Sequence, residues 1–280
     1  MIVWLASYPK SGNTWVRSLI ASLLYSEDGI FNFKLLEQIL QFPDKRYFLK
    51  FTQDLGNLDV IKKYWISAQK EINQDKKLRF FKTHHINCTI GKDHFTDRNN
   101  TLATIYIVRD PRNLVSSISN HFIKSAEEAK NFLLTPKIIA GSKKDSGMKK
   151  DDLKTLIGTW SEHYRYWKMN KDNYLLIKYE DLIKNPFNEL EKIIFFLKKF
   201  IKINTNKTKN DNIINSTNFE RMKTLEMEGK FKESAYDVDG NIRNFFHRGP
   251  KNNWKNLLDP KIKNEIENKL SVEMKELGYL

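Results

Sequence analysis

The stretch Val3-Trp4-Leu5-Ala6-Ser7-Tyr8-Pro9-Lys10-Ser11-Gly12-Asn13-Thr14-Trp15-Val16-Arg17 decides how the rest of the chain is arranged. Residues 2–6 form a short apolar run of the kind that lies inside a parallel sheet, and turn-forming residues end it. Large apolar side chains then recur at helical spacing as far as residue 24, with Thr14 or Asn13 as the expected N-cap. The stretch therefore predicts a buried strand, a tight loop and a helix whose free N–H groups face the loop.

The loop between this strand and helix has the chemistry of an anion site. It combines Lys10, two hydroxyl side chains and Gly12 at a helix N-terminus, where N–H groups, the helix dipole and an ammonium group favour a phosphate. Its order differs from that of the common nucleotide loop GxxxxGK(S/T), because here the lysine precedes the glycine. An ordinary strand-to-helix turn with a solvated lysine is the alternative that these residues leave open.

The composition is that of one globular domain with an anionic partner. With 280 residues, of which 40% are hydrophobic and 12% aromatic, the chain can build one sizeable core, and its two halves do not differ in composition. The formal net charge of +14 suits nucleic acid, anionic lipid or a multiply phosphorylated small molecule. Much of the excess is lysine scattered among Asn and Ile, which disfavours a nucleic-acid partner.

A single cysteine and the lack of a long apolar run restrict the class further. Because Cys88 is the only cysteine, the chain cannot form an internal disulfide, and no cluster of Cys and His residues has the spacing of a zinc site. No run approaches the roughly 20 apolar residues of a membrane span, and the N-terminus enters a strand without a basic leader region. We therefore expect a cytoplasmic protein with neither a metal nor a transmembrane segment.

A polar cluster follows the short β-prone run at residues 78–83. His84 and His85 come directly after this run, and open α/β sheets bind ligands just beyond the carboxyl ends of their strands. Histidine can take up a proton near neutral pH, so either residue is a candidate general base. The adjacent pair leaves the choice between them open.

Residues 101–108 form the clearest predicted strand of the chain, and Arg109 follows it directly. Pro111 suits the first turn of a helix that continues to Phe122, which places Ser117 near the arginine. Arginine can engage a phosphate through two hydrogen bonds at once. This strand end is therefore a second candidate anion site.

The remaining segments complete an alternating α/β series. Apolar residues at helical spacing predict helices at residues 58–72, 156–167, 190–200, from 217 onward and about 260–277. Residues 174–182 predict a buried strand that leads to an acidic turn, and residues 31–51 predict short helices and loops rather than sheet. Two weakly patterned segments, about 123–154 and 201–247, are predicted to be mobile lid or substrate loops, with 201–218 a loop by composition. Residues 245–256 are a third candidate phosphate contact.

Six motifs occur in the order of a known family. They are SYPKSGNTWVR at residues 7–17, KTHH at 82–85, VRDPRNLVSSISNHF at 108–122, KYEDL at 178–182, TNF at 217–219 and HRGPKNNWKN at 247–256. Together they resemble the motifs of the PAPS-dependent cytosolic-type sulfotransferases, from about residue 2 to about residue 258. The resemblance implies an α/β fold: a single domain, residues 1–280, with a central parallel β-sheet flanked by helices and a P-loop-kinase-like strand-loop-helix phosphosulfate site.

The resemblance also implies which residues bind 3′-phosphoadenosine 5′-phosphosulfate (PAPS). The residues around the 5′-phosphosulfate would be Lys10, Ser11, Gly12, Asn13 and Thr14. Those of the adenine pocket would be Trp15, Tyr179, Thr217, Asn218 and Phe219. Those of the 3′-phosphate site would be Arg109, Ser117, Arg248 and Gly249, with His247 beside them. On the same analogy the catalytic residues are the base His84 and the lysines Lys10 and Lys82.

The predicted reaction transfers the sulfuryl group of PAPS to a hydroxyl, or an amine, of a small-molecule acceptor and leaves adenosine 3′,5′-bisphosphate (PAP). Sulfuryl transfer requires positioning and charge stabilisation more than covalent catalysis. His84 would remove the acceptor proton, the acceptor oxygen would attack sulfur in line, and Lys10 with Lys82 would neutralise the developing charge. No metal is expected, because ammonium groups and N–H donors serve in its place.

Two alternatives belong to other classes of protein. A small-molecule kinase shares the strand-loop-helix site, but this chain lacks the GK(S/T) order and an obvious carboxylate for magnesium. A basic nucleic-acid-binding protein would bind with an affinity that falls steeply with salt, without preferring a 3′-phosphorylated adenosine.

Three residues depart from the family's late motif, which usually reads RKGxxGDWKN. His247 replaces the arginine, and Asn252 and Asn253 replace the glycine and the aspartate. Because a neutral histidine supplies less charge than arginine, we expect a looser 3′-phosphate site and a mild pH dependence. The dimerisation sequence that often follows this motif is not recognisable at residues 255–265, so the oligomeric state is open.

The sequence does not identify the acceptor. Several aromatic residues could line an apolar pocket for a phenol, an alcohol or a lipid-like hydroxyl, although core packing is the commoner fate of such residues. They are Phe31, Phe33, Phe42, Tyr47 and Phe48. A carbohydrate hydroxyl or an amine is also compatible with the motifs.

Overall fold

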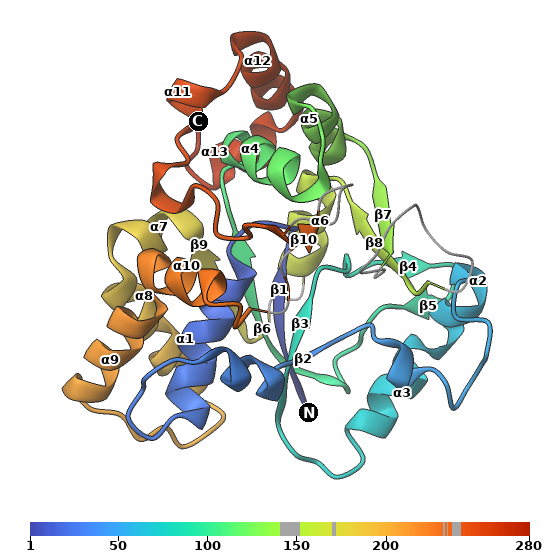
Figure 1. The fold of residues 1–280 in the computed structure, drawn as a ribbon. Helices are drawn as coiled ribbons and strands as arrows, with labels where there is room; N and C mark the ends of the chain where they lie inside the picture. Colours follow the sequence, from blue (N-terminus) through green and yellow to red (C-terminus); the bar gives the residue numbers. More distant parts are fainter. Residues whose placement is uncertain (141–151, 170–171, 232, 234, 237–241) are drawn as a thin grey trace.

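A five-stranded parallel sheet forms the centre of the molecule (Figure 1). The computed structural model describes residues 1–280 except 141–151, 170–171, 232, 234 and 237–241. The strand order is β2-β3-β1-β6-β9. The strands are β1 (Ile2–Ser7), β2 (Leu40–Gln41), β3 (Arg79–Thr83), β6 (Thr101–Val108) and β9 (Tyr174–Lys178). All residues of the central strand β1 are buried, as its continuous apolar run predicts.

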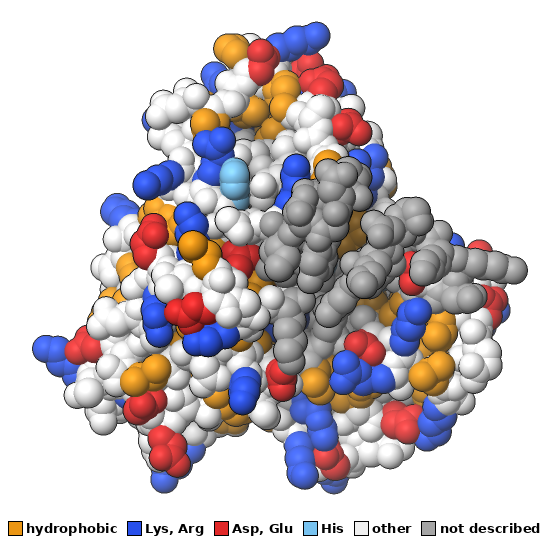
Figure 2. All heavy atoms as spheres, viewed as in Figure 1, with side chains coloured by type: hydrophobic (Ala, Val, Ile, Leu, Met, Phe, Trp, Pro, Cys, Tyr) orange, Lys and Arg blue, Asp and Glu red, His pale blue; other side chains and the backbone are white. Residues whose placement is uncertain are grey.

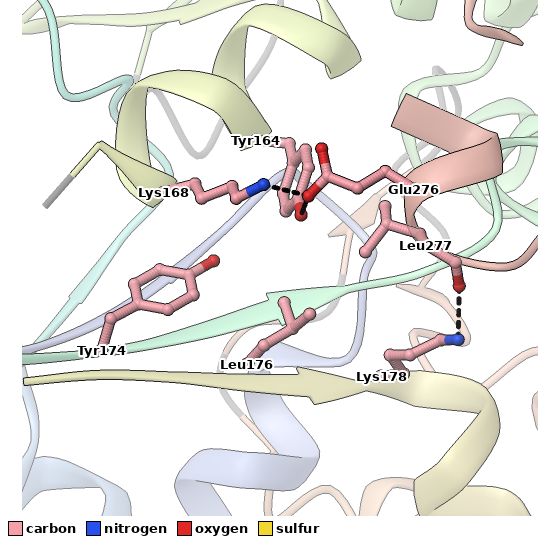
Figure 3. A pocket seen from close by; sticks show the side chains of 7 residues that line it. All are labelled: Tyr164, Lys168, Tyr174, Leu176, Lys178, Glu276 and Leu277. Atoms are coloured by element: carbon pink, nitrogen blue, oxygen red, sulfur yellow. Dashed lines mark hydrogen bonds and ion pairs between the residues drawn. The ribbon is translucent and has the colours of Figure 1, made fainter. Parts of the chain in front are cut away.

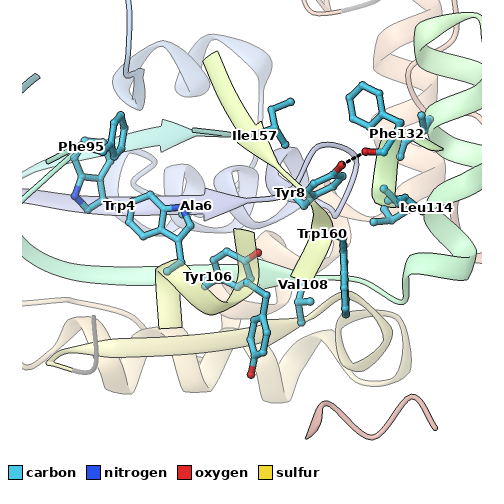
Figure 4. Close-up of a cluster of buried hydrophobic side chains, with 14 of the residues drawn as sticks. Trp4, Ala6, Tyr8, Phe95, Tyr106, Val108, Leu114, Phe132, Ile157 and Trp160 are labelled. Atoms are coloured by element: carbon cyan, nitrogen blue, oxygen red, sulfur yellow. Dashed lines mark hydrogen bonds between the residues drawn. The ribbon is translucent and has the colours of Figure 1, made fainter. Parts of the chain in front are cut away.

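The side chains of β1 alternate between two cores, because successive residues of a strand point to opposite faces of the sheet. Val3 and Leu5 pack on the face covered by α1 (Asn13–Tyr25) and α8 (Pro186–Leu197). Trp4 and Ala6 pack on the opposite face, in the cluster that includes α6 (Trp160–Lys168) (Figure 4). One apolar run thus organises both helical layers, and the predicted single α/β domain with a helix-flanked parallel sheet is confirmed.

The other elements surround this frame (Figure 1). The remaining α-helices of the described residues are α2 (Leu58–Ile61), α3 (Trp65–Ile72), α4 (Pro111–Phe122), α5 (Ala126–Leu134), α7 (Tyr179–Lys184), α9 (Lys207–Thr217), α10 (Phe219–Met227), α11 (Trp254–Leu257), α12 (Pro260–Lys269) and α13 (Ser271–Glu276). The 3-10 helices are η1 (Phe33–Gln38), η2 (Lys45–Tyr47), η3 (Lys62–Tyr64) and η4 (Gly249–Lys251). Antiparallel pairs form between β4 (Thr89–Ile90) and β5 (Asp93–His94), β7 (Lys137–Ala140) and β8 (Lys154–Gly158), and β10 (Ala235–Tyr236) and β11 (Ile242–Arg243). Within the part of the chain that the structure describes, no helix is long and apolar enough to cross a membrane.

The two predicted loop segments contain regular structure. The segment 123–154 holds α5 and most of the β7–β8 pair, so a loop is wrong for its described residues; residues 141–151 lie outside them. The segment 201–218 holds α9, which Asn206 caps and which buries Ile213 in the core. Local pattern missed these elements because capping and tertiary burial stabilise them. The mobility of both segments stays a prediction.

Several element boundaries also differ from those predicted. The helix expected from residue 156 begins at Trp160, because residues 154–158 pair as β8. Residues 179–184 form α7 rather than a turn, and β2 adds an edge strand in a region where no sheet was predicted. The last helix is divided into α12 and α13.

The predicted side-chain cap of α1 is wrong. Gly12 is the N-cap residue, and no side chain caps this helix. The Asn13 side chain instead donates hydrogen bonds to the Leu5 carbonyl oxygen (2.9 Å) and to Ser7 Oγ (3.2 Å). These bonds fix the start of α1 against β1.

Candidate active site

The carboxyl ends of neighbouring strands bring the predicted site residues together. The loop 8–12 follows β1, His84 follows β3, Arg109 follows β6, and Tyr179 follows β9. Because these strands are parallel neighbours, their carboxyl ends lie side by side, which is where open α/β sheets bind ligands.

The loop after β1 buries polar groups that lack a hydrogen-bond partner in the described part of the chain. Among the described residues, neither Lys10 Nζ nor Ser11 Oγ forms a hydrogen bond, and Lys10 adopts the left-handed backbone region with a φ of 67°. The Lys10 ammonium lies 3.4 Å from the centroid of the Phe245 ring. Burial lowers the pKa of Lys10 to about 7, with Lys82 and Arg109 adding to the effect. Since buried polar groups are normally paired, these groups are suited to an anionic ligand.

Gly12 is demanded both by the loop conformation and by its neighbour. Its φ is +102°, and a Cβ at this position would lie 2.6 Å from Cδ2 of Tyr179. Trp15 meets the Tyr179 ring edge-on, with the ring centroids 5.8 Å apart. Two of the five predicted adenine contacts, Trp15 and Tyr179, therefore lie together beside the loop.

His84 is held with one ring nitrogen available. Its Nδ1 lies 2.8 Å from the Ser7 carbonyl oxygen and 3.2 Å from Ser7 Oγ. Because a carbonyl oxygen only accepts, Nδ1 carries the proton and the lone pair is on Nε2. Burial, followed by the charge of Lys82, lowers the pKa of His84 to about 3, so the ring is neutral at physiological pH. A neutral imidazole with a free Nε2 has the form that a general base needs.

His85 lies in the core instead. Its ring stacks on Phe95 with a centroid distance of 4.1 Å, and it meets Trp65 edge-on. His85 is fully buried, and its Nδ1 donates to the Ile86 carbonyl oxygen (2.7 Å). These contacts favour His84 in the choice that the sequence left open.

A second buried cluster lies at the end of β6. The Arg109 guanidinium donates through Nη1 to Ser117 Oγ (3.3 Å) and to the Lys10 carbonyl oxygen (3.3 Å), and it stacks 4.0 Å from the centroid of Tyr179. Among the described residues, Arg109 Nε has no partner. The structure thus brings together Arg109 and Ser117, two of the residues predicted to lie at the 3′-phosphate.

One of the departures from the late motif joins this cluster. The Asn252 amide donates to Ser117 Oγ (3.1 Å) and to the Asn113 carbonyl oxygen (2.8 Å). The Asn113 side chain in turn accepts a hydrogen bond from the Trp254 backbone (2.9 Å). The segment 252–254 is therefore fastened to α4, although the sequence predicted only that these departures would loosen the site.

Of the other predicted residues in the late motif, Gly249 packs against Phe219, and His247 and Arg248 lie on the surface. Gly249 lies so close to Phe219 that a Cβ there would be 2.4 Å from the ring. His247 and Arg248 are exposed, and the partial desolvation of the His247 ring, followed by the charge of Arg248, lowers the pKa of His247. The protonated form of His247 therefore contributes little at neutral pH.

Thr217 and Asn218 are engaged in helix structure. Thr217 Oγ1 donates to the Ile213 carbonyl oxygen (2.7 Å) within α9. Asn218 caps α10 by accepting from the Arg221 backbone (2.9 Å). Their predicted adenine contacts stay predictions.

Two charged residues at this edge were not predicted. Arg17 Nη1 lies 2.9 Å from Glu233 Oε1, and Lys82 Nζ lies 3.1 Å from Glu233 Oε2. Arg17 was detectable, because it is the only charged residue in the otherwise apolar and small-residue helix α1. No sequence pattern marks Glu233.

The aromatic residues considered for an acceptor pocket do not form one surface. Phe42 and Phe48 are buried in the core on one face of the sheet, whereas Phe31 is buried in the core on the other. Phe33 lies against Phe231, with centroids 4.7 Å apart.

A surface cavity of about 480 Å³ lies at the β9 edge of the sheet, and none of its lining residues is a predicted site residue (Figure 3). It is lined by Tyr164, Lys168, Tyr174, Leu176, Lys178, Glu276 and Leu277. Glu276 accepts from Tyr164 (2.6 Å) and pairs with Lys168, and Lys178 donates to the Leu277 carbonyl oxygen (2.5 Å). Most of its polar groups are therefore satisfied within the protein.

The face of the molecule in Figure 2 carries basic and acidic side chains interspersed, rather than one basic stripe. Among the described residues, no group of three or more His, Cys, Asp and Glu side chains is arranged to hold a metal ion. A parallel α/β sheet whose edge gathers buried cations around a neutral histidine defines an enzyme that transfers an anionic group.

The sulfotransferase domain model matches residues 2–278, and the chain belongs to this family. Its reaction class is therefore sulfuryl transfer, and the kinase and nucleic-acid-binding alternatives are not favoured. The chain is 24% identical to dog sulfotransferase 1B1 over 261 residues, covering 91% of this chain and 77% of that protein. It is 26% identical to the luciferin sulfotransferase of Photinus pyralis, covering 92% of this chain and 67% of that protein.

Solved structures share the fold. A mouse sulfotransferase, SULT7A1, complexed with PAP matches with a TM-score of 0.58 and 22% identity, covering 98% of this chain and 83% of that one. Retinol dehydratase in a complex with retinol and PAP matches with a TM-score of 0.61 and 16% identity, covering 98% and 81%.

Proposed function

We propose that this protein transfers the sulfuryl group of PAPS to a hydroxyl, or an amine, of a small-molecule acceptor, with His84 as the general base. One observation carries the proposal: among the described residues, buried cationic and hydroxyl groups without a hydrogen-bond partner lie at the same strand ends as a neutral histidine whose Nε2 is free. The PAP complexes among the structural relatives support a 3′-phosphorylated nucleotide as the donor.

The unpartnered groups fit the two anionic ends of such a nucleotide. Lys10 and Ser11, at the N-terminus of α1, would bind the 5′-phosphosulfate, since helix N-termini and ammonium groups favour anions. Arg109, with its unpartnered Nε, would bind the 3′-phosphate together with Ser117. Trp15 and Tyr179, which contact each other edge-on, would supply aromatic surface for the adenine to lie against.

The chemical step follows from the state of His84. Nε2 accepts the proton of the acceptor hydroxyl as the acceptor oxygen forms its bond to sulfur and the bond from sulfur to the phosphate oxygen breaks. Ser7 holds the ring through Nδ1 and stabilises the imidazolium that results. Lys10 and Lys82 stabilise the negative charge that moves to the leaving phosphate.

The acceptor class is inferred from relatives. Three relatives are named 3-alpha-hydroxysteroid, luciferin and flavonol 3-sulfotransferases, after compounds in which a hydroxyl is borne by a ring system. We infer an apolar alcohol or phenol for this chain as well. A cytoplasmic location and metal-independent catalysis stay predictions.

Thermal unfolding with added nucleotide tests the donor. We expect saturating PAP to raise the unfolding midpoint by several degrees, because a ligand at 100 times its Kd adds about 2.7 kcal/mol, and ATP to have little effect. Equal stabilisation by ATP would instead indicate a kinase-like site. Incubation with labelled PAPS and a panel of alcohols, phenols, sugars and amines, followed by mass spectrometry, then identifies the acceptor.

A further inference from the structure

One internal carboxylate bridges two buried cations beside the candidate base. Glu233 Oε1 lies 2.9 Å from Arg17 Nη1, and Glu233 Oε2 lies 3.1 Å from Lys82 Nζ. The side chains of Arg17 and Lys82 are 5% and 13% exposed, whereas that of Glu233 is 33% exposed. The cations are therefore part of the protein interior, and the carboxylate reaches them from the surface.

The fold places both cations on the same face of the sheet. Lys82 is in register with Leu5 of β1, and Leu5 points toward α1. Arg17 lies one helical turn after Asn13, whose side chain is bonded to the Leu5 carbonyl oxygen. Arg17 and Lys82 thus face each other between α1 and β3, next to the strand end that carries His84.

The geometry is that of a receptor for an oxyanion. Each oxygen of the Glu233 carboxylate takes one cation, which is how two positive side chains share a carboxylate, a phosphate or a sulfate. In the described structure Arg17 Nε is also buried without a partner, so the subsite keeps a donor that Glu233 does not use. Lys10 lies close enough for Glu233 to act on its charge as well.

We propose that Arg17 and Lys82 form an oxyanion subsite of the active site, and that Glu233 occupies it until a substrate oxyanion takes its place. The inference rests on the proposed sulfuryl transfer. Two groups could supply this oxyanion: the terminal sulfuryl oxygens of the donor, or an acidic group on the acceptor. Exchange of one oxyanion for another keeps the charge around His84 nearly constant, so Glu233 preserves the site in the absence of substrate.

Substitution of the internal carboxylate tests the proposal. The neutral side chain in Glu233→Gln binds Arg17 and Lys82 less strongly than the carboxylate does. PAPS should therefore bind about tenfold more tightly, which is the effect of one charge-assisted hydrogen bond. The affinity for PAP, which lacks the sulfuryl group, should change by less than about threefold if the donor supplies the oxyanion. Glu228→Gln is the matched control, because Glu228 is exposed on the same segment and pairs only with Lys230 in the described residues. Binding is measured by isothermal titration calorimetry.

A second titration tests whether the acceptor, rather than the donor, supplies the oxyanion. With PAP saturating, 4-hydroxybenzoate and 4-methylphenol are added to wild-type protein and to Glu233→Gln. A selective gain for the carboxylate-bearing phenol assigns the subsite to the acceptor, and a selective gain for PAPS assigns it to the donor. Both support an oxyanion subsite.

Arg17 variants separate binding from folding. Arg17→Lys should retain the selectivity and Arg17→Gln should lose it, with unfolding midpoints recorded for each protein. If Glu233→Gln and Glu228→Gln bind all four probes alike, the inference is overturned even where Arg17→Gln fails to fold. A wild-type protein that binds neither PAP nor PAPS would overturn the proposed function itself, which is a distinguishable result.

Discussion

The role of His84 is set by the atoms around it rather than by its residue type. The Ser7 carbonyl oxygen fixes the proton on Nδ1, and His163 Nε2 contacts the His84 carbonyl oxygen (3.1 Å). His163 Nδ1 in turn lies 2.8 Å from the Tyr106 hydroxyl. This buried chain orients the backbone and the ring together, as enzymes require of a base that must meet a substrate proton.

His84→Ala should remove the base while leaving the nucleotide contacts in place. We expect kcat to fall by about 100-fold or more, the usual contribution of a general base, with PAP affinity within about threefold of wild type. Transfer of labelled sulfate and PAP titration measure the two effects. Turnover close to that of wild type would show that another group is the base.

Lys10 should make nucleotide affinity depend on pH. Burial holds its pKa at about 7, below the ordinary value of 10.5, so the free protein loses this proton as the pH rises through 7. An anionic nucleotide needs the ammonium form, so affinity is highest below pH 7 and falls above it, with proton uptake on binding in this window. Calorimetry at pH 6 to 9 in buffers of different ionisation enthalpy measures both. A gain in affinity confined to pH values below 6.5 would implicate His247 instead, because its pKa is lowered and only its protonated form adds positive charge.

At the scale of elements, the turn at 249–254 depends on α4 for its place. Asn252 contacts Ser117 and Asn113, so the late motif and the β6–α4 motif meet through one amide. Gly249 brings the backbone of the same turn against Phe219 at the start of α10. Two helices and a turn from distant parts of the chain thus form one wall of the proposed 3′-phosphate site.

Asn252→Ala should weaken binding of 3′-phosphorylated nucleotides selectively. The variant loses the hydrogen bond that orients Ser117, and a single hydrogen bond contributes about 1 kcal/mol, or roughly fivefold in affinity. Affinity for PAP should fall by this factor, while affinity for adenosine 5′-phosphosulfate, which lacks the 3′-phosphate, should not change. An equal loss for both nucleotides would contradict a role at the 3′-phosphate.

At the scale of the molecule, the C-terminal helices are joined to the sheet edge through Arg112. Its guanidinium pairs with Asp110 (2.6 Å) and Glu267 (2.5 Å), donates to the Tyr279 carbonyl oxygen (2.8 Å) and lies 3.9 Å from the centroid of the Trp254 ring. Both guanidinium and Asp110 carboxylate are buried. The residues that flank Arg109 in the RDPR motif therefore serve the fold, and Arg109 alone turns toward the site.

Arg112→Met should destabilise the whole protein. Removal of one partner leaves the Asp110 charge buried and uncompensated, which costs about 3–5 kcal/mol in the free energy of unfolding. The control is Arg98→Met, because the side chains of Arg98 and its partner Asp172 are 85% and 71% exposed and an exposed ion pair contributes about 1 kcal/mol or less. Urea denaturation measures both. Similar losses in the two variants would show that the buried network is not the source of stability.

The sequence by itself determined the elements whose signal is local. The strands β1, β3, β6 and β9 and the helix α1 are recognisable because apolar runs and helical spacing are properties of consecutive residues. Lys10, His84 and Arg109 could be predicted for the same reason, since each lies within three residues of the end of such a strand, whereas Tyr179 was predicted from the family resemblance.

Only the tertiary structure decided what depends on contacts between distant segments. α9 and the β7–β8 pair form where local pattern was weak, because capping and packing stabilise them. The difference between His84 and His85 arises because the β1 backbone reaches one ring and the core encloses the other. In the Arg17–Glu233–Lys82 cluster, Glu233 lies 216 positions along the chain from Arg17 and 151 from Lys82. No periodicity in the sequence predicts such a cluster, because charge pairing depends on distance in space and not along the chain.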